Sequence, residues 1–279
     1  MFKVELQKIL TNIAFYLAIA SAVMLLLLGN IYVSSMTGEE YTVIDLIIDD
    51  NRSEIIKEAD LYTSDVITGD ISSYLEMFVP VIVAIPFVII VCGEKKNSNA
   101  RFELYRIGKN RFILGKYFAD MVAGGMVIMA AYMIFSLIIS FILPSGEGII
   151  SELRNEFLIG EDVIAGFLHK SCGIKGLYIY KFFRMFLYGA VSVIPAFALS
   201  MITKNRYIII SMPFMFYYLL GKFISKQGSE KLGYFLPTTV GNIYATDVLR
   251  LIIIYVAEAL LVIVFCRIYL GRKCDCGEE

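Results

Sequence analysis

The sequence predicts an all-α membrane protein, with six transmembrane helices in a single domain over residues 1–279. Two observations support this fold class. The 279 residues are 58% hydrophobic, whereas a soluble domain is roughly 45–50% apolar. The excess lies in runs long enough to cross a bilayer, which takes about 20 apolar residues per helix.

Six apolar runs account for the predicted transmembrane helices, at residues 10–32, 74–93, 117–143, 183–203, 207–223 and 251–270. Pro80 and Pro86 lie inside the second run and Pro195 inside the fourth. Such prolines are tolerated in membranes where neighbouring groups bond the freed carbonyls. The fifth run is the shortest. The runs leave three longer connections, at residues 33–73, 144–182 and 224–250.

The distribution of basic residues predicts the orientation. The segment Glu94 to Lys116 carries seven of the 25 Lys and Arg residues. If both termini are inside, the inner segments (1–8, 94–116, 204–206 and 267–279) hold 14 Lys and Arg residues. The outer segments (31–76, 144–184 and 222–250) hold 11, in more than twice as many residues. The positive-inside rule therefore predicts that both termini are cytoplasmic.

Small extracellular elements are expected in the longer connections. Val43 to Ile48 is an apolar, β-branched run that suggests a short strand. Ser53 to Tyr62 and Glu152 to Phe167 have the apolar spacing of short helices. The last outer connection is apolar for a solvated loop, so it is a candidate for re-entrant helices covered by protein.

The N-terminal segment is amphipathic. Its polar face contains Lys3, Glu5, Gln7 and Lys8, and its apolar face contains Phe2, Leu6, Ile9, Leu10 and Ile13. Such a helix lies along the inner membrane interface before it turns into the first span. The alternative is that it is the start of one long first helix. Ala20-Ser21-Ala22 resembles a signal cleavage site, but the apolar run continues through Leu28, which favours an uncleaved first span.

The basic loop between the second and third runs contains a predicted cytoplasmic helix. Asn97 and Ser98 can cap its start, and Gly108 can end it in a left-handed conformation. The helix consists of Arg101, Phe102, Glu103, Leu104, Tyr105, Arg106 and Ile107. Exposed aromatic and arginine side chains are favoured at protein interfaces. The alternative is a basic loop held against anionic lipid headgroups.

Several chemistries are excluded by the residues present. No Gly-Lys pair has the following Ser or Thr and the upstream glycine of a phosphate-binding loop, so the chain should not bind ATP itself. His169 is the single histidine, which leaves no basis for a Ser-His-Asp set or a histidine metal site. We therefore expect no catalytic residue, no cofactor, no metal and no nucleic-acid partner.

Two acidic residues fall inside the predicted spans. Asp120 lies one helical turn after Lys116, which predicts an ion pair near the inner interface. Glu258 lies near the middle of the sixth span, where a carboxylate is costly and usually faces the bundle or a water-filled path. We regard Glu258 as a candidate for the translocation path. The alternative is a hydrogen-bonded glutamate packed against another helix.

This arrangement resembles the membrane subunit of a type-two ATP-binding-cassette exporter. The resemblance rests on the interfacial helix, the six spans with both ends inside, and the segment Phe102 to Lys116, which is similar to that family's coupling region. There, a glutamate-containing helix is followed by a basic residue, an aliphatic stretch and a Gly-Lys pair. Arg101-Phe102 replace the Gly-Thr that often precedes this glutamate.

The resemblance implies a permease subunit that works with two copies of a separate ATPase subunit and with a second permease, identical or homologous. Such proteins usually export peptides, drugs, lipids or polysaccharides, and the chain would lie in a bacterial cell membrane. Two alternatives belong to other classes. One is a secondary transporter or channel that uses Glu258, and the other is a membrane sensor or scaffold with a ligand-binding outer loop.

Overall fold

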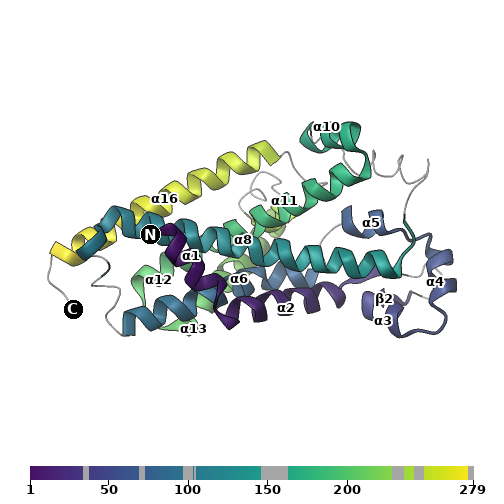
Figure 1. Ribbon diagram of the computed structural model, residues 1–279, viewed down its shortest axis with the longest axis horizontal. Coiled ribbons are helices and arrows are strands. Elements are labelled where there is room, and N and C mark those ends of the chain that lie inside the picture. Colours follow the sequence, from purple (N-terminus) through teal and green to yellow (C-terminus); the bar gives the residue numbers. More distant parts are fainter. Residues whose placement is uncertain are drawn as a thin grey trace.

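The computed structural model describes residues 1–33, 38–68, 73–96, 103, 105–145, 163–227, 236–241 and 248–275. Within these ranges the protein is predominantly helical (Figure 1). Five spans are long and apolar enough to cross a membrane. They are formed by α6 (Ser73–Lys96), α8 (Lys109–Ile142), α11 (Ile174–Ser192) continued by α12 (Ile194–Ile202), α13 (Arg206–Gln227) and α16 (Val248–Asp275). The chain is thus a helical membrane protein, as predicted.

The N-terminal region is a bent pair of helices. α1 (Phe2–Leu10) and α2 (Ile13–Leu27) meet at an angle of 63°, and together they would be a sixth span. Asn12 begins α2, because its side chain accepts a hydrogen bond from the Ala14 amide at 2.9 Å. The bend argues against one continuous first helix. It agrees with a separate amphipathic helix before the membrane segment, while the six-span topology stays a prediction.

The helix α8 is the centre of the bundle, with α1, α2, α6 and α11 packed around it (Figure 1). It starts at Lys109, eight residues before the predicted third span, so it takes up the second half of the basic loop. Glycines allow α8 and α11 to approach closely, as small residues do between membrane helices. A Cβ atom added at Gly189 would lie only 2.3 Å from the carbonyl oxygen of Gly124.

The fourth span begins earlier than predicted. α11 starts at Ile174, nine residues before the expected residue 183, and a break at Val193 separates it from α12, which has Pro195 in its first turn. Lys181 and Arg184, which were counted as outer-loop residues, are fully buried in α11. Arg184 donates a hydrogen bond at 3.1 Å to the carbonyl of Thr239 in α15 (Thr238–Gly241).

Pro80 and Pro86 lie within α6, which continues through both of them. Proline lacks an N–H, so Pro80 cannot bond the carbonyl of Glu76, four residues earlier. The Tyr188 hydroxyl of α11 donates to that carbonyl at 3.0 Å. A neighbouring helix therefore satisfies the acceptor that the proline frees, as the tolerance of prolines in membrane helices requires.

A group of small elements follows α2. An antiparallel pair is formed by β1 (Asn30–Val33) and β2 (Glu40–Thr42), and three short helices follow it: α3 (Val43–Ile48), α4 (Arg52–Ala59) and α5 (Thr63–Thr68). The helix predicted at Ser53 to Tyr62 corresponds to α4. The predicted helix at Glu152 to Phe167 lies mostly outside the described residues, which include α10 (Val163–Cys172).

The strand predicted at Val43 to Ile48 is wrong, because this segment is the helix α3. Thr42 and Asp45 form a capping box, in which each side chain bonds the other residue's backbone amide. The Asp45 carboxylate accepts hydrogen bonds from the Thr42 backbone amide and from the Thr42 hydroxyl, and these two bonds lower the pKa of Asp45 below its usual value. The capping box therefore outweighs the preference of the β-branched residues in this segment for a strand.

The short helices α4 and α5 cap the C-terminal end of α8. The last carbonyls of a helix have no partner within it. Arg52 of α4 donates to the Ile142 carbonyl at 2.6 Å, and the Thr63 hydroxyl donates to Leu143 and Pro144 at 3.1 and 3.0 Å. A guanidinium at this position also suits the negative end of the helix dipole.

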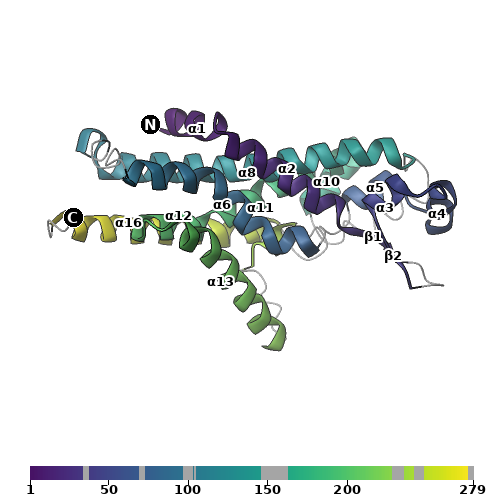
Figure 2. The ribbon, with the colours of Figure 1, turned by 90° about the horizontal axis from the view of Figure 1, so that it is seen from below.

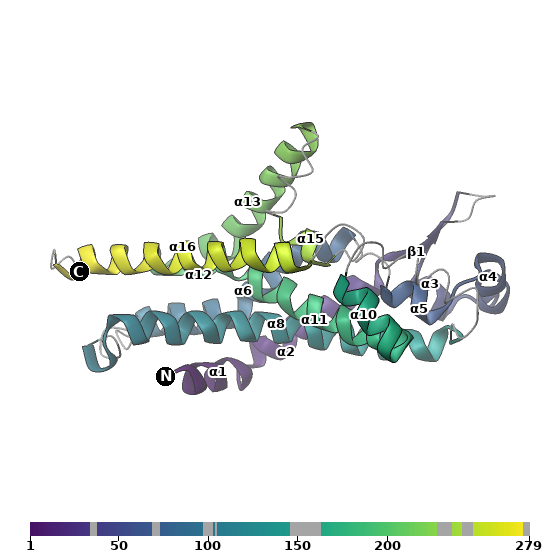
Figure 3. The ribbon, with the colours of Figure 1, turned by 90° about the horizontal axis from the view of Figure 1, so that it is seen from above.

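The elements sort into two ends of an elongated molecule. The N-terminus, the C-terminal part of α16 and the ends of α6 and α8 that flank the basic loop share one end (Figure 1). The helices α3, α4, α5 and α10 lie at the other end (Figure 2). The two groups fall at opposite ends of the bundle, while the assignment of one end to the cytoplasm stays a prediction. The helix α13 leaves the bundle at a wide angle (Figures 2 and 3).

Candidate functional site

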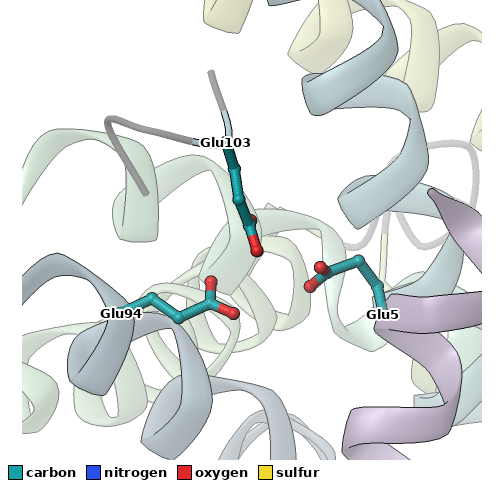
Figure 4. Close-up of side chains that lie close together, drawn as sticks. All are labelled: Glu5, Glu94 and Glu103. Carbon is teal, nitrogen blue, oxygen red and sulfur yellow. The ribbon is translucent and has the colours of Figure 1, made fainter. Parts of the chain in front are cut away.

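Five charged side chains meet at the end of the molecule that holds the N-terminus. Glu5 and Lys8 come from α1, Glu94 from the end of α6, Glu103 from the basic loop, and Lys116 from the second turn of α8. We call these five residues the charge cluster. Figure 4 shows the three glutamates pointing toward one another from three different segments.

Each glutamate of the charge cluster bridges both lysines. The Nζ of Lys8 lies 2.9 Å from Glu5 Oε1, 2.9 Å from Glu94 Oε1 and 3.0 Å from Glu103 Oε1. The Nζ of Lys116 lies 3.3 Å from Glu5 Oε2 and 3.6 Å from Glu103 Oε2, and it contacts Glu94 Oε2. One oxygen of every carboxylate thus faces one lysine and the other oxygen faces the second.

The charge cluster is protected from solvent on the side of Lys116. The Lys116 side chain is only 3% exposed and that of Glu5 only 6%, while Lys8 at 35% forms the outer edge. Lys116 also lies 5.0 Å from the centre of the Phe112 ring. A buried ammonium is stable only where its charge is compensated, so the three carboxylates are needed to hold Lys116 in place.

The three carboxylates are also the group in the described part of the chain that could hold a metal ion, with ligand atoms within 4.8 Å of one another. In this structure every one of these carboxylates is already bonded to lysine ammonium groups. A cation would have to displace both lysines. The arrangement therefore fits an ion-pair network better than a metal site.

Close packing joins α1 to α8 beside the cluster. A Cβ atom at Gly115 would lie 2.6 Å from Cγ of Met1, so the glycine makes room for the start of α1. The charge cluster adds the basic loop and α6 to this contact. A displacement of the basic loop at Glu103 would therefore disturb the ion pairs of α1, α6 and α8 together.

The predicted coupling helix is partly described. Glu103 and residues 105–107 are helical, and Gly108 follows them with a φ of 85°, which glycine adopts readily. Tyr105 is 84% exposed and Arg106 is also exposed, whereas Ile107 is half-buried. Arg101, Phe102 and Leu104 lie outside the described residues. The helix thus points Glu103 inward and leaves an aromatic side chain free.

The expected ion pair between Lys116 and Asp120 is not formed. Lys116 pairs with the three glutamates instead, because they surround its ammonium from neighbouring segments. Asp120 is 3% exposed, and its Oδ2 atom has no hydrogen-bond partner among the described residues. Burying a polar group without such a partner is costly.

Glu258 lies on the face of α16 that looks toward the bundle. Among the buried residues of this helix, Leu251, Tyr255 and Cys266 recur at the spacing that places Glu258 on the same face. Even so, Glu258 is only half-buried. It interacts electrostatically with Tyr117 of α8, Tyr217 of α13 and Tyr255, and no described residue forms an ion pair or hydrogen bond with it.

Sequence reasoning identified Glu103 and Lys116 as parts of one motif but missed Glu5, Lys8 and Glu94 as their partners. A signal was present, since Glu5 and Lys8 are three residues apart on one helix and Glu94 directly follows an apolar run. Both acids would ordinarily be assigned to a solvated surface. Their meeting depends on how α1 folds back over α8, which no local pattern reveals.

Comparisons with known proteins add no relative. No protein-family model, curated protein sequence or solved structure gives a significant match to this chain. The function has to be inferred from the residues and their geometry.

Proposed function

We propose that the chain is the permease subunit of an ATP-driven exporter of the ATP-binding-cassette type, with ATP hydrolysis in a separate subunit. In this proposal the basic loop receives the movement of the ATPase. The charge cluster passes it to the membrane helices. The chain would act in a bacterial cell membrane, beside a second permease.

The observation that carries the proposal is the double role of the helix in the basic loop. One of its residues, Glu103, bridges Lys8 and Lys116, while Tyr105, two positions on, is almost fully exposed. An exposed aromatic side chain beside arginine is the composition of a protein-binding hot spot. The same short helix therefore has a surface for a partner and a rigid link to three membrane-associated helices.

The charge cluster suits mechanical transmission because its ion pairs converge on two lysines. Breaking one contact leaves the remaining charges incompletely paired in a poorly solvated place, which is costly. Small shifts are therefore expected to move the cluster as a unit. Allosteric coupling of this kind needs packed elements with distinct arrangements, and α1, α6 and α8 supply the packed elements.

The proposal is tested by purifying the tagged chain from its native membranes in a mild detergent. We expect an ATP-hydrolysing protein in a ratio of two copies per two permeases, and vanadate-sensitive ATPase activity in the purified complex. A chain that purifies without any ATPase, yet transports after reconstitution into vesicles, would contradict the proposal.

A second candidate function rests on Glu258. An intramembrane carboxylate with no ion-pair partner among the described residues is a common feature of ion-coupled transporters. In that case transport would follow an imposed ion gradient and would need no nucleotide. Uptake or efflux by the purified chain alone, in ATP-free vesicles with a pH or Na⁺ gradient, distinguishes this function from the first.

A further inference from the structure

We propose that Lys95 is a positioning residue that transmits a displacement of the charge cluster to α12 and from there to the start of α13. The five residues of the charge cluster belong to α1, α6, α8 and the basic loop, so the cluster itself does not reach α12 or α13. This inference rests on the proposed function and deepens it, because it extends the path of the movement to two further membrane helices.

The position of Lys95 beside Glu94 is the first argument. Both residues lie in the last turn of α6, and successive residues of an α-helix point about 100° apart around its axis. Glu94 pairs with Lys8 at 2.9 Å and also contacts Lys116, so it faces α1 and α8. Lys95 contacts the end of α12 instead. A shift or rotation of this one turn therefore acts on both sides of α6.

The contact with α12 is the second argument. The Lys95 ammonium donates one hydrogen bond to the carbonyl of Ser200 and another, 3.3 Å long, to the carbonyl of Thr203. The last carbonyls of a helix have no partner within it, and a cation at this position also suits the negative end of the helix dipole. Lys95 is half-buried, so water competes less for these carbonyls. The side chain therefore fixes the end of α12 to the end of α6.

The connection from α12 to α13 is the third argument. Only Thr203, Lys204 and Asn205 separate the two helices. The Asn205 amide donates to the Thr203 hydroxyl oxygen at 3.1 Å, and the Asn205 side chain accepts from the Tyr207 amide at 3.0 Å. A movement of the end of α12 therefore acts directly on the first turn of α13. Because α13 leaves the bundle at a wide angle (Figure 3), a small tilt at its start displaces its far end by more.

The test asks whether α12 responds to the charge cluster through Lys95. Amide hydrogen exchange, which reports local opening, is measured over residues 197–207 of the purified full chain in lipid nanodiscs. Glu103→Gln weakens the cluster without touching α12. We expect it to speed exchange in this segment by at least about fivefold, the lower end of the usual coupling between two sites. When Lys95→Met is already present, Glu103→Gln should cause no further increase.

Two other variants and a reference helix serve as controls. Lys95→Arg keeps a cation in reach of the same carbonyls, so it should retain the response to Glu103→Gln. Lys96→Met should retain it as well, because Lys96 is the exposed neighbour of Lys95 at the end of α6. The helix α10 lies at the other end of the molecule (Figure 2), and its exchange should stay the same in every variant. A merely structural role of Lys95 would leave the response to Glu103→Gln unchanged.

Two results would overturn the proposal. One is an unchanged exchange rate of α12 in Glu103→Gln, and this result needs no variant of Lys95, so it counts even if Lys95→Met does not fold. The other is an equal response with and without Lys95, since the movement would then pass through the packing of α12 on its other neighbours. Neither result involves an ATPase, so failure of this inference is distinguishable from failure of the transport assignment.

Discussion

The charge cluster and Glu258 differ in how their charges are paired. On the packed side, formed by α1, α6, α8 and α11, the charge cluster pairs its lysines with three glutamates, and Arg184 bonds a backbone carbonyl. On the open side, formed by α13 and α16, Glu258 forms no ion pair or hydrogen bond with any described residue. Under the proposed function, the packed side transmits movement, and Glu258 on the open side is the candidate for the translocation path.

The largest effect is expected from breaking the charge cluster. Lys116→Met leaves three glutamates close together with only Lys8 to neutralise them. Removing one partner of a buried ion-pair network costs about 3–5 kcal/mol, so the midpoint of thermal unfolding in detergent should fall strongly. Lys96→Met is the control, since Lys96 is exposed at the end of α6. If the two variants unfold alike, the cluster does not stabilise the packed side.

A smaller loss of stability is expected at the crossing of α8 and α11. Gly189→Ala places a Cβ atom 2.3 Å from the Gly124 carbonyl oxygen, so the backbones must separate. Overpacking of this kind costs about 1–3 kcal/mol. Gly221→Ala in α13 is the matched change on the open side, where the nearest atom is 3.9 Å away. It should be neutral or stabilising in the same unfolding measurement, and equal destabilisation would contradict the contrast between the sides.

The hydroxyl of Tyr188 tests how the packed side accommodates Pro80. Tyr188→Phe removes the donor to the Glu76 carbonyl and should destabilise the protein by on the order of 1 kcal/mol. Tyr16→Phe changes an exposed tyrosine of α2 and serves as the control. An unchanged unfolding midpoint for Tyr188→Phe would mean that the freed carbonyl finds another donor.

The smallest effect on stability is expected at Glu258. Glu258→Gln removes a charge that has no described partner, so it should change the unfolding free energy by less than about 1 kcal/mol or raise it slightly. The comparison with Lys116→Met is direct, because both variants neutralise one charged side chain near or within the membrane. A large destabilisation by Glu258→Gln would show that the carboxylate is a structural group, contrary to the place in the translocation path proposed for it.

Much of the fold could be predicted from the sequence, because the helices that cross a membrane must be long and apolar. The boundaries of α6, α13 and α16 follow their apolar runs within a few residues. The starts of α8 and α11 could not be predicted in this way. Lys116, Lys181 and Arg184 are charged and suggest a loop by composition, but each is buried in a helix. Three glutamates pair with Lys116, and Arg184 donates to the Thr239 carbonyl.

The candidate site was predictable only in part. Local pattern identified the helix around Glu103 and its end at Gly108, and the depth of Glu258 in its span. The partners of these residues come from segments far apart in the chain. Glu5 reaches Lys116 because α1 lies across α8 beside Gly115, and that contact depends on tertiary packing. Tertiary packing also explains why the predicted ion pair between Lys116 and Asp120 is not formed.

The central claim is that the helix in the basic loop docks a separate ATPase, and Tyr105 tests it most directly. The measurement is the amount of ATP-hydrolysing protein that co-purifies per permease for the unaltered chain, Tyr105→Asp and Tyr207→Asp. Tyr207 is the control because it is similarly exposed, at 76% against 84% for Tyr105. We predict that Tyr105→Asp lowers the ratio by at least about tenfold while Tyr207→Asp leaves it unchanged. Equal ratios in all three preparations, or no ATPase with the unaltered chain, would contradict the account.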